Sequence, residues 1–316
     1  MKTSKVCILG GSGFVGRHVT ELLDERGLQV KVLTRMRERA RHLNVLPGVE
    51  VVESDVHDQT ELAAQFTGMD AVINLVGVLH DGRGRASFAD AHTILAEKVI
   101  NACERAGVHR LLHMSALKAD ADGPSQYLRS KGQGEAMVRT AATGIAVTVF
   151  RPSVIFGPGD GFLNRFASLI RQFPVLPLGS ADARFQPVYV EDVARAIADS
   201  IDNPAAFDTG YDICGPRVYT LRELVQFTSD VMGKKRWIFG LSPGLSKLQA
   251  ALLEFVPGKP MTRDNLASMQ VDSVCDCDFE VQFGFRPASL EAIAPTYLVN
   301  RTPRGRYAEF RVRAGR

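Results

Sequence analysis

Three residues in the middle of the chain have the types and spacing of a proton-transfer site. Tyr127 and Lys131 are four positions apart, so on a helix they share one face, and Ser115 precedes them at the end of an apolar run. A lysine ammonium near a phenol favours the phenolate and lowers the tyrosine pKa. Such a tyrosine can give a proton to a carbonyl oxygen, or take one from an alcohol, while a hydride is transferred. We predict Tyr127 as the acid or base, Lys131 as the group that tunes it and Ser115 as the holder of the substrate oxygen.

A glycine-rich segment near the N-terminus has the pattern of a turn that binds a dinucleotide. Residues 10–16 read G-G-S-G-F-V-G, follow the apolar run 5–9 and precede a predicted helix. Gly10 permits a tight turn, Gly13 lets backbone approach a pyrophosphate, and Gly16 permits close packing of helix on strand. Free N–H groups and the dipole at the helix N-terminus favour the phosphates. The alternative is a glycine turn without a ligand. The predicted contacts are Gly10, Ser12, Gly13, Phe14, Val15 and Gly16.

The end of the second predicted strand favours NADP(H) over NAD(H). An NAD site usually has Asp or Glu there, whereas Thr34 is followed by four Arg within seven residues and no acid stands at the strand end. A guanidinium binds a 2′-phosphate through a charged fork, and an acid would repel it. We predict contacts from Thr34, Arg35 and, second, Arg37, and a solvated basic face for Arg39 and Arg41.

Further cofactor contacts are expected after the next strands, because ligands of open parallel sheets bind at the carboxyl ends of the strands. Asp55 and Val56 follow the third predicted strand, toward the adenine, and Val76 and Gly77 follow the fourth. The three proton-transfer residues are also predicted to contact the cofactor, the lysine through the nicotinamide ribose. The alternatives for these three are a tyrosine packed on the sheet with its lysine in solvent, and a trio that binds cofactor without turnover.

A parallel sheet is needed to bring these groups to one edge, and the pattern of the first 150 residues predicts one. Short apolar runs alternate with helical patterns, which implies βαβ units with right-handed crossovers. The predicted strands are 5–10, 29–34, 49–53, 71–76, 110–115 and 146–151. The predicted helices lie near 14–26, 37–43, 59–67, 88–106 and 125–142. The expected fold class is α/β, a doubly wound Rossmann parallel sheet with a small C-terminal α/β lobe.

Turn-forming residues end the regular alternation after residue 151. Further strands are predicted at 185–190 and 211–214, and helices at 161–172, from 191, and at 220–231, 245–255, 262–269 and 287–298. The expected division is an NAD(P)-binding domain over 1–155, a smaller substrate or lid lobe over 156–300 and a basic tail over 301–316. Elements near 185–214 are expected to return to the first sheet.

Composition excludes several classes of protein. The 316 residues are 45% hydrophobic and 23% charged with a net charge of +3, which does not suggest a dedicated nucleic-acid binder. No apolar run reaches the 18 or so residues of a spanning helix. Five cysteines without a CxxC pair predict a reducing compartment and no disulfide framework, with Cys275 and Cys277 on the surface and without a redox role. The seven histidines form no cluster, and no metal site is predicted.

Together these features resemble the short-chain dehydrogenase/reductase superfamily, in its extended or atypical branch. The glycine loop and the Tyr/Lys pair are shared across that superfamily. A narrower resemblance is to the dehydrogenase-like accessory subunit of mitochondrial complex I (NADH:ubiquinone oxidoreductase) and its free-standing bacterial relatives. It is carried by the segments 112–117, 127–135, 151–157, 162–167, 177–180, 186–193 and 262–265.

The resemblance has mixed implications for function. It implies NADPH binding without proven turnover for the mitochondrial members, and NAD(P)-binding, epimerase-like or reductase-like roles for the bacterial ones. It also implies that Pro152, Ser153 and Val154 face the nicotinamide carboxamide through backbone groups. Ser115 is followed by Ala-Leu, and no sugar-nucleotide clamp is recognisable, which weakens the epimerase interpretation. Because the glycine loop begins at residue 10, we expect no organelle presequence and favour a bacterial free-standing relative.

The expected function is that of an NADP(H)-binding oxidoreductase acting on a carbonyl, an alcohol or a quinone-like hydrophobic substrate. The alternatives are a non-catalytic NADPH-binding structural or assembly protein, and a nucleotide-sugar epimerase or dehydratase. The expected location is cytoplasmic; peripheral association with the inner membrane, contact with a respiratory complex and the oligomeric state are left open. The apolar stretches 237–241 and 245–256 are expected to form lobe core and lid; the alternative is a hydrophobic mouth for a quinone- or lipid-like substrate, or a face that docks on a larger complex. The tail, with six Arg against one Glu, is expected to be solvated, with adhesion to an anionic membrane or a partner as the alternative.

Overall fold

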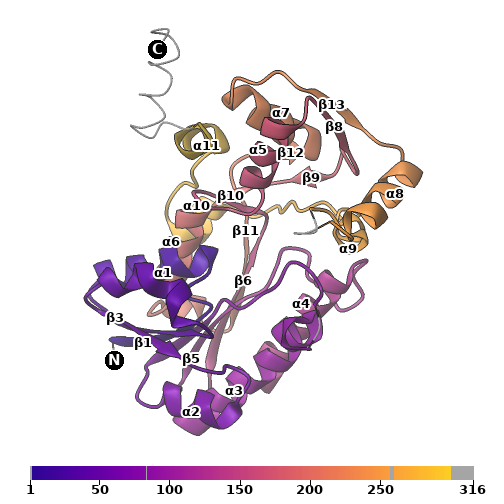
Figure 1. The fold of residues 1–316 in the computed structure, drawn as a ribbon. Coiled ribbons are helices and arrows are strands. Elements are labelled where there is room, and N and C mark those ends of the chain that lie inside the picture. The colour runs from indigo at the N-terminus through magenta and orange to yellow at the C-terminus, as the bar shows by residue number, and fades with distance from the viewer. Residues whose placement is uncertain (1, 83, 257–259, 300–316) are drawn as a thin grey trace.

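A seven-stranded parallel sheet forms the centre of the first part of the molecule (Figure 1). The computed structural model describes residues 2–82, 84–256 and 260–299. The strands, in sequence order, are β1 Lys5–Leu9, β2 Gln29–Thr34, β3 Val49–Glu53, β4 Ala71–Asn74, β5 Arg110–Met114, β6 Ala146–Pro152 and β11 Thr209–Ile213. In space the order is β11-β6-β5-β4-β1-β2-β3, and every neighbouring pair is parallel. The predicted doubly wound Rossmann sheet is confirmed.

Helices cover both faces of this sheet. On one face lie α1 Phe14–Glu25 and α6 Val190–Ser200, and on the other α2 Gln59–Phe66, α3 Leu95–Ala106 and α4 Gln126–Ala141 (Figure 1). Successive residues of β1 enter different cores: Val6 and Ile8 pack with α1, Cys7 and Leu9 with α2 and α3. A strand buried on both faces is apolar at every position, which explains the continuous apolar runs in the sequence.

Three elements of the first part differ from their predicted form. β4 ends at Asn74 instead of residue 76, because the Asn74 side chain accepts a hydrogen bond from the backbone N–H of Val76 and turns the chain. The segment Arg37–Val45 is a 3-10 helix. The first turn of the predicted helix 88–106 is a π-helix, Ala89–Ile94, where it crosses α4. A Cβ on Gly134 of α4 would lie 2.2 Å from the backbone oxygen of His92, so this crossing requires a glycine.

In its described residues, the second part contains three short strand pairs and six helices. The pairs are β7 Ile155–Phe156 with β10 Val188–Tyr189, β8 Val175–Leu178 with β13 Trp237–Gly240, and β9 Arg184–Phe185 with β12 Tyr219–Thr220. The helices are α5 Leu163–Gln172, α7 Leu221–Val231, α8 Pro243–Leu253, α9 Arg263–Ser268, α10 Phe279–Phe283 and α11 Leu290–Leu298, and two short 3-10 turns lie at Gly84–Ala86 and Pro204–Ala206.

The return of the chain to the first sheet takes place through α6, which packs on α1, and through β11, which pairs with β6. The predicted strand at 185–190 is divided between β9 and β10, because the two halves pair with different partners. The domain division at residue 155 stays a prediction. The predicted tail 301–316 lies outside the described residues. Within the described ranges, no helix is both long and apolar enough to cross a membrane.

Candidate functional site

The glycine loop between β1 and α1 is folded so tightly that side chains are excluded from it. Gly10 has φ +78°, and a Cβ on it would lie 3.0 Å from the carbonyl carbon of Leu75. A Cβ on Gly16 would lie 2.2 Å from the oxygen of Gly10. The N–H of Gly13 closes the turn by donating to that same oxygen at 2.9 Å. The three roles predicted for glycine are therefore consistent with the backbone of this loop.

The first turn of α1 leaves its N–H groups without a side-chain cap. The N-cap residue is Gly13, and the turn contains no acidic residue. The N-terminus of α2 is different, because the Asp58 carboxylate accepts hydrogen bonds from Thr60 and Glu61. Uncapped N–H groups with the positive end of the helix dipole suit a pyrophosphate. Arg17 of α1 adds a positive charge beside the loop, where it donates to the backbone oxygen of Pro158.

The predicted 2′-phosphate residues follow β2 and lie at the surface. Arg35 and Arg37 are exposed, and neither forms an ion pair within the described part of the chain. Arg41 is paired with Glu38, in agreement with the solvated face expected there. Thr34 is buried and hydrogen-bonds within the turn to Met36, and the N–H of Arg37 donates to Glu53 at 3.2 Å.

Asp55, which is predicted to lie near the adenine, is engaged by neighbouring groups. Its carboxylate accepts from the N–H of His57 at 3.0 Å and pairs with Arg85 at 2.6 Å. The His57 N–H and then the Arg85 charge hold the Asp55 pKa below its usual value. The adjacent Val56 is buried. Arg85 lies in the short 3-10 turn after β4, and nothing in the sequence around it indicated this contact.

Lys131 lies against the ends of β4 and β5. Its Nζ donates to the backbone oxygen of Met114 at 3.1 Å, and a Cβ on Gly77 would meet that Nζ at 3.1 Å. The alternative in which this lysine points into solvent is wrong, because Lys131 is buried. Burial lowers the pKa of Lys131 to about 8.

Tyr127 lies at the start of α4, against the stacked rings of Phe88 and His92. It makes edge contacts with Phe88 and His92 at ring-centroid distances of 5.8 and 5.7 Å. We predicted that the lysine would lower the tyrosine pKa; instead, burial raises the pKa of Tyr127 to about 12. The predicted lowering fails because the nearby ammonium is bound by the Met114 carbonyl and is itself desolvated.

His92 is a further part of this site, and its position at the opening of the fourth predicted helix had suggested that it could face the active site. Its Nε2 accepts from the N–H of Val78 at 3.0 Å, and its Nδ1 lies 2.8 Å from the Ser130 hydroxyl. Burial, and then the charge of Lys131, lower the pKa of His92 to about 2, so the ring is neutral. A neutral ring that accepts at Nε2 carries its proton on Nδ1 and donates it to Ser130. His92 thereby joins the loop after β4 to α4.

Ser115 is buried at the end of β5 and makes no hydrogen bond to Tyr127 among the described residues. Its hydroxyl lowers the pKa of Glu135, which lies one helical turn beyond Lys131. Although burial raises the Glu135 pKa, hydrogen bonds and charge from Arg151, with smaller effects of Ser115 and Arg139, bring it below its usual value. The buried Ser115 hydroxyl has no hydrogen-bond partner in the geometry of the described residues. Its role toward a substrate oxygen stays a prediction.

The segment 152–154 lies at the same edge of the sheet. The oxygen of Pro152 accepts from Leu117, the N–H of Ser153 donates to Ile213, and the oxygen of Val154 accepts from Val188. These three backbone groups are therefore occupied within the protein. The Ser153 hydroxyl donates to the backbone oxygen of Ser273 at 2.8 Å. Contacts of this segment with a nicotinamide stay predicted.

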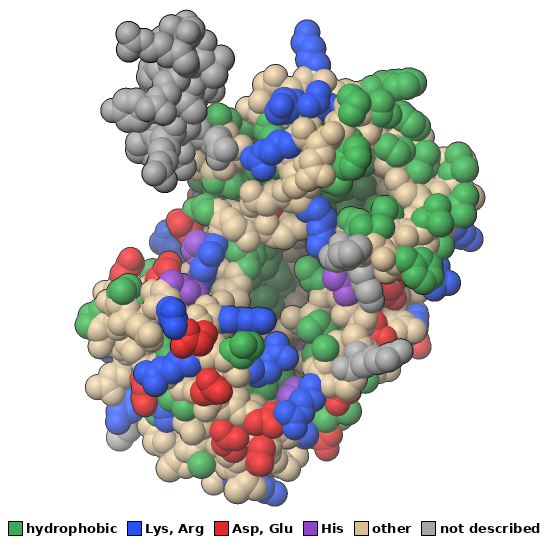
Figure 2. All heavy atoms as spheres, in the orientation of Figure 1, with side chains coloured by type: hydrophobic (Ala, Val, Ile, Leu, Met, Phe, Trp, Pro, Cys, Tyr) green, Lys and Arg blue, Asp and Glu red, His purple; other side chains and the backbone are tan. Residues whose placement is uncertain are grey.

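The second part of the molecule reaches the tyrosine through α9. Asp264 accepts hydrogen bonds from the N–H groups of Gln126 and Tyr127 at 2.7 and 3.2 Å, and Ser268 bonds the Ser125 hydroxyl at 2.8 Å. Figure 2 shows the surface hollowed between the two parts of the molecule, with hydrophobic side chains inside the hollow. The site thus lies where the second part meets the carboxyl edge of the sheet.

The expectation of a surface segment without a disulfide at Cys275 and Cys277 was wrong, while the lack of a redox role stays a prediction. Cys275 is buried and forms a disulfide with Cys277, and the buried Cys214 lies next to them. The segment is drawn inward because Gln186 bonds the N–H of Cys275 and because Phe185 and Ser273 form a β-bridge. Among the described residues, these three cysteines are the one group whose ligand atoms lie close enough to hold a metal ion.

Comparisons with known proteins agree with the dinucleotide-binding fold described above. The model of the NAD dependent epimerase/dehydratase family matches residues 6–214. The chain is 33% identical over 259 residues to the mitochondrial NADH dehydrogenase (ubiquinone) 1 alpha subcomplex subunit 9 of Arabidopsis thaliana, covering 80% of this chain and 64% of that protein. The rat protein of that name is 30% identical, over 90% of this chain and 77% of its own. The chain therefore spans slightly less than two thirds of the plant relative.

A ceramide reductase of Caulobacter vibrioides is 30% identical, over 76% of this chain and 74% of its own. Among solved structures, an NADPH-dependent quinone oxidoreductase from Escherichia coli complexed with NADPH has a TM-score of 0.75 at 21% identity, covering 93% of this chain and 99% of its own. A dTDP-glucose 4,6-dehydratase from Streptomyces venezuelae with NAD bound has a TM-score of 0.74 at 21% identity, covering 97% and 98%. At these identities the two structures support the fold alone.

Proposed function

The chain belongs to the NAD-dependent epimerase/dehydratase family, and we propose that it is an NADPH-dependent reductase acting on the carbonyl group of a hydrophobic substrate. Its relatives include complex I accessory subunits, a ceramide reductase and an azoreductase. NAD(P) binding is common to this fold. The cofactor preference, the reaction and the substrate class are parts of the proposal.

The observation that carries the proposal is the place of the Tyr127–Lys131 pair: Tyr127 packs on His92, which bonds the loop after β4, and Lys131 donates to the end of β5. With its pKa raised to about 12 by burial, the phenol keeps its proton at neutral pH. A protonated phenol is an acid, so the site is prepared to donate to a carbonyl oxygen rather than to deprotonate an alcohol. An epimerase or an alcohol dehydrogenase begins with the removal of a proton and needs a phenolate. The environment of Tyr127 therefore supports reduction.

The proposed mechanism assigns the reaction to the edge of the sheet where α4 begins. NADPH, when bound, supplies the hydride that the carbonyl carbon accepts. Tyr127 donates its phenolic proton to the carbonyl oxygen, the alcohol leaves, and water returns a proton to Tyr127. Lys131, held by Met114, is positioned to bond the nicotinamide ribose. The uncapped first turn of α1 would hold the pyrophosphate, and Arg35 the 2′-phosphate.

Two features support a hydrophobic substrate. One is the similarity to a ceramide reductase. The other is the set of exposed apolar side chains on the second part, which Figure 2 shows as a broad area of hydrophobic surface. The exposed apolar side chains of the second part include Trp237, Leu245, Leu248, Leu252 and Phe255. Apolar area of this kind is expected at the mouth of a site for lipid- or quinone-like molecules.

A second candidate function is a non-catalytic NADPH-binding protein of a respiratory assembly. The observation that favours it is the similarity to complex I subunits over most of this chain. In this case the protein would bind a membrane-associated partner, and the phenol would have no turnover role. The same apolar surface would then serve as the contact with that partner.

A Tyr127→Phe variant separates the two candidates. We expect NADPH-dependent reduction of long-chain ketones and quinones by the wild type, and a fall in kcat of at least ~100-fold in the variant, because general acid catalysis is lost. NADPH affinity should change little, since the ring and its packing remain. The matched control is Tyr211→Phe, which keeps the ring packed on Phe150 and Phe283. It removes a hydroxyl that makes a long surface hydrogen bond to Ala205, so it should keep wild-type activity.

Tight NADPH binding with no turnover of any carbonyl or quinone would favour the assembly protein. A chain purified with firmly bound NAD⁺ would instead favour the epimerase or dehydratase, whose reaction regenerates its cofactor internally.

A further inference from the structure

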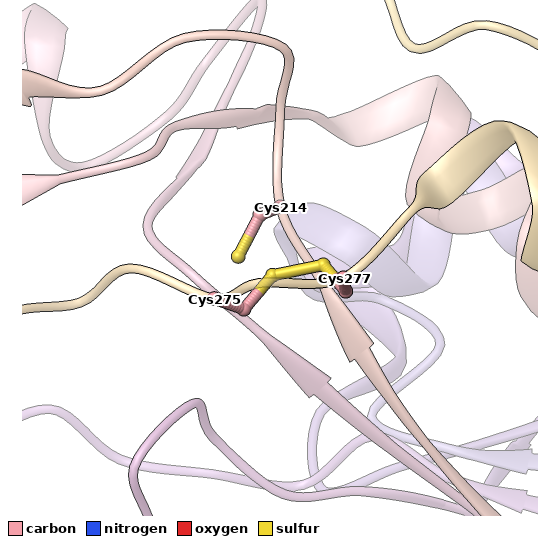
Figure 3. Close-up of side chains that lie close together, drawn as sticks. All are labelled: Cys214, Cys275 and Cys277. Carbon is pink, nitrogen blue, oxygen red and sulfur yellow. A yellow bond between two sulfur atoms is a disulfide. The ribbon is translucent and has the colours of Figure 1, made fainter.

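Three sulfur atoms from two distant segments meet beside the predicted nicotinamide segment (Figure 3). Cys214 follows the last strand of the sheet, β11, whereas Cys275 and Cys277 lie in the segment between α9 and α10. Their Sγ atoms all lie within 4.8 Å of one another, and Cys275 is joined to Cys277 in a disulfide. Figure 3 shows the Cys214 side chain directed toward that disulfide.

This convergence is built by contacts that do not depend on the disulfide. The N–H of Cys275 donates to Gln186 Oε1 at 3.2 Å. The same N–H lowers the pKa of the Cys214 thiol, against the effect of burial. Two residues earlier, Ser273 accepts a hydrogen bond from Ser153 and bridges to Phe185. The two segments therefore stay together when the disulfide opens.

The three cysteines differ in their access to water. Cys214 is 1% exposed and Cys275 is 9% exposed, whereas Cys277 is half-buried beside the exposed Asp276. A thiolate leaves more readily where water can solvate it. Attack on the Cys275 sulfur, which expels Cys277, is therefore favoured over attack on Cys277, which would expel a thiolate into the interior.

We propose that Cys214, Cys275 and Cys277 form a thiol–disulfide exchange site, in which the Cys275–Cys277 disulfide interconverts with a Cys214–Cys275 disulfide. The Cys214 thiolate attacks Cys275 Sγ, the bond to Cys277 breaks, and Cys277 leaves as a thiolate that takes up the proton lost by Cys214. No net electrons are transferred in this step. Two molecules of a low-molecular-weight thiol, oxidised to their disulfide, would reduce either form to three thiols.

The exchange changes what the disulfide connects. The Cys275–Cys277 bond closes a loop within one segment, whereas the Cys214–Cys275 bond would join the end of β11 to the segment that holds Ser153 through Ser273. The position of the exchange would thus determine whether this wall of the predicted cofactor site is covalently closed, and reduction to three thiols would open it.

Peptide mapping of the full chain tests the proposal. Trypsin places Cys214 on the peptide 196–217, while Cys275 and Cys277 share a peptide that begins at residue 264. The exchanged form therefore appears as a cross-link of two peptides, and the original form as one peptide lighter by two hydrogens. The protein is incubated with mixtures of reduced and oxidised glutathione, quenched with acid and alkylated before digestion.

We expect the cross-link in wild-type protein and in Cys277→Ser at a level at least ~10-fold above that in Cys214→Ala. In Cys277→Ser it should be nearly the only intramolecular disulfide. Cys103→Ala, which removes a buried thiol outside the cluster, is the matched control and should equal wild type. Burial raises the Cys214 pKa to about 12; the Cys275 N–H and Lys118 oppose this rise, and Asp212 adds to it. The exchange rate should therefore rise ~10-fold per pH unit between pH 7 and 9.

Two outcomes would overturn the proposal. One is the absence of the cross-link in a folded Cys277→Ser protein at all glutathione ratios. The other is a reduced chain that retains one zinc ion after gel filtration, loses it in Cys214→Ala and forms no cross-link, because the three sulfurs would then be metal ligands rather than exchange partners.

Discussion

The arginines around β2 and α1 show how the same residue type differs in role from one position to the next. Arg41 is neutralised by Glu38, and Arg17 is bound to the Pro158 carbonyl. Arg35 has no ion-pair partner within the described residues and follows the strand end where a dinucleotide ribose is expected. An exposed guanidinium without a partner is available to an anionic ligand, so Arg35 carries the proposed cofactor preference.

Replacing Arg35 by Ala tests this preference. We expect the Kd for NADPH to rise at least ~10-fold, because a charge-assisted hydrogen bond contributes about 1.5–3 kcal/mol, while the Kd for NADH stays nearly constant. Titration calorimetry with both dinucleotides measures the effect. Arg41→Ala is the control and should leave both affinities unchanged. Equal weakening of NADPH and NADH in Arg35→Ala would contradict a contact with the 2′-phosphate.

At the scale of elements, the turn between β1 and α1 depends on how closely the helix approaches the strand. Gly16 is buried in the first turn of α1, directly over the backbone of Gly10 and Gly11. A side chain at this position meets backbone atoms, which cannot move aside as the end of a flexible side chain can. The glycine is therefore required by the packing of the empty protein as well as by any phosphate.

We expect Gly16→Ala to lower the free energy of unfolding by about 1–3 kcal/mol, the usual cost of overpacking, and to abolish dinucleotide binding. Urea denaturation and calorimetry measure the two effects. Gly244→Ala in α8 is the matched control, because its Cβ would meet no atom within 4 Å. That variant should be neutral or slightly more stable, since Ala favours helix over Gly. Wild-type stability of Gly16→Ala would disprove the tight approach of α1.

At the scale of the whole molecule, the second part is connected to the proposed acid by one carboxylate. Asp264 of α9 accepts the N–H groups of Gln126 and Tyr127 at the N-terminus of α4. A negative charge at a helix N-terminus is favourable, so this contact both docks α9 and holds the first turn that carries the tyrosine. The docking of α9 and the position of Tyr127 are thus coupled.

Asp264→Ala should lower kcat by about 10-fold or more and destabilise the fold by about 0.5–2 kcal/mol, because two N–H donors at the N-terminus of α4 lose a charged acceptor. Asp264→Asn, which keeps one acceptor oxygen, should show an intermediate loss of both. Steady-state kinetics with NADPH and thermal unfolding provide the measurements. If Asp264→Ala loses stability but retains wild-type kcat, the contact is structural and does not position the tyrosine.

The sequence by itself determined the sheet and the turn at its centre. Apolar runs alternating with helical patterns predicted six strands of the parallel sheet, and the glycine spacing predicted the loop before α1, because both depend on neighbours along the chain. The Tyr127–Lys131 pair was predicted for the same reason, as a four-residue spacing on one helix. The candidate site could therefore be predicted before the surroundings of its residues were known.

Tertiary structure decided the surroundings of each residue in the candidate site and in the cysteine cluster. The pairing of Asp55 with Arg85, the cap of Asp264 on α4 and the meeting of Cys214 with Cys275 join residues 30 to 138 positions apart, and no local pattern encodes such distances. Burial decided the rest, since it raised the Tyr127 pKa where the neighbouring lysine alone predicted a lower one. Spacing specifies which groups can share a face, whereas the protonation state of each group depends on how much water the folded chain removes from it.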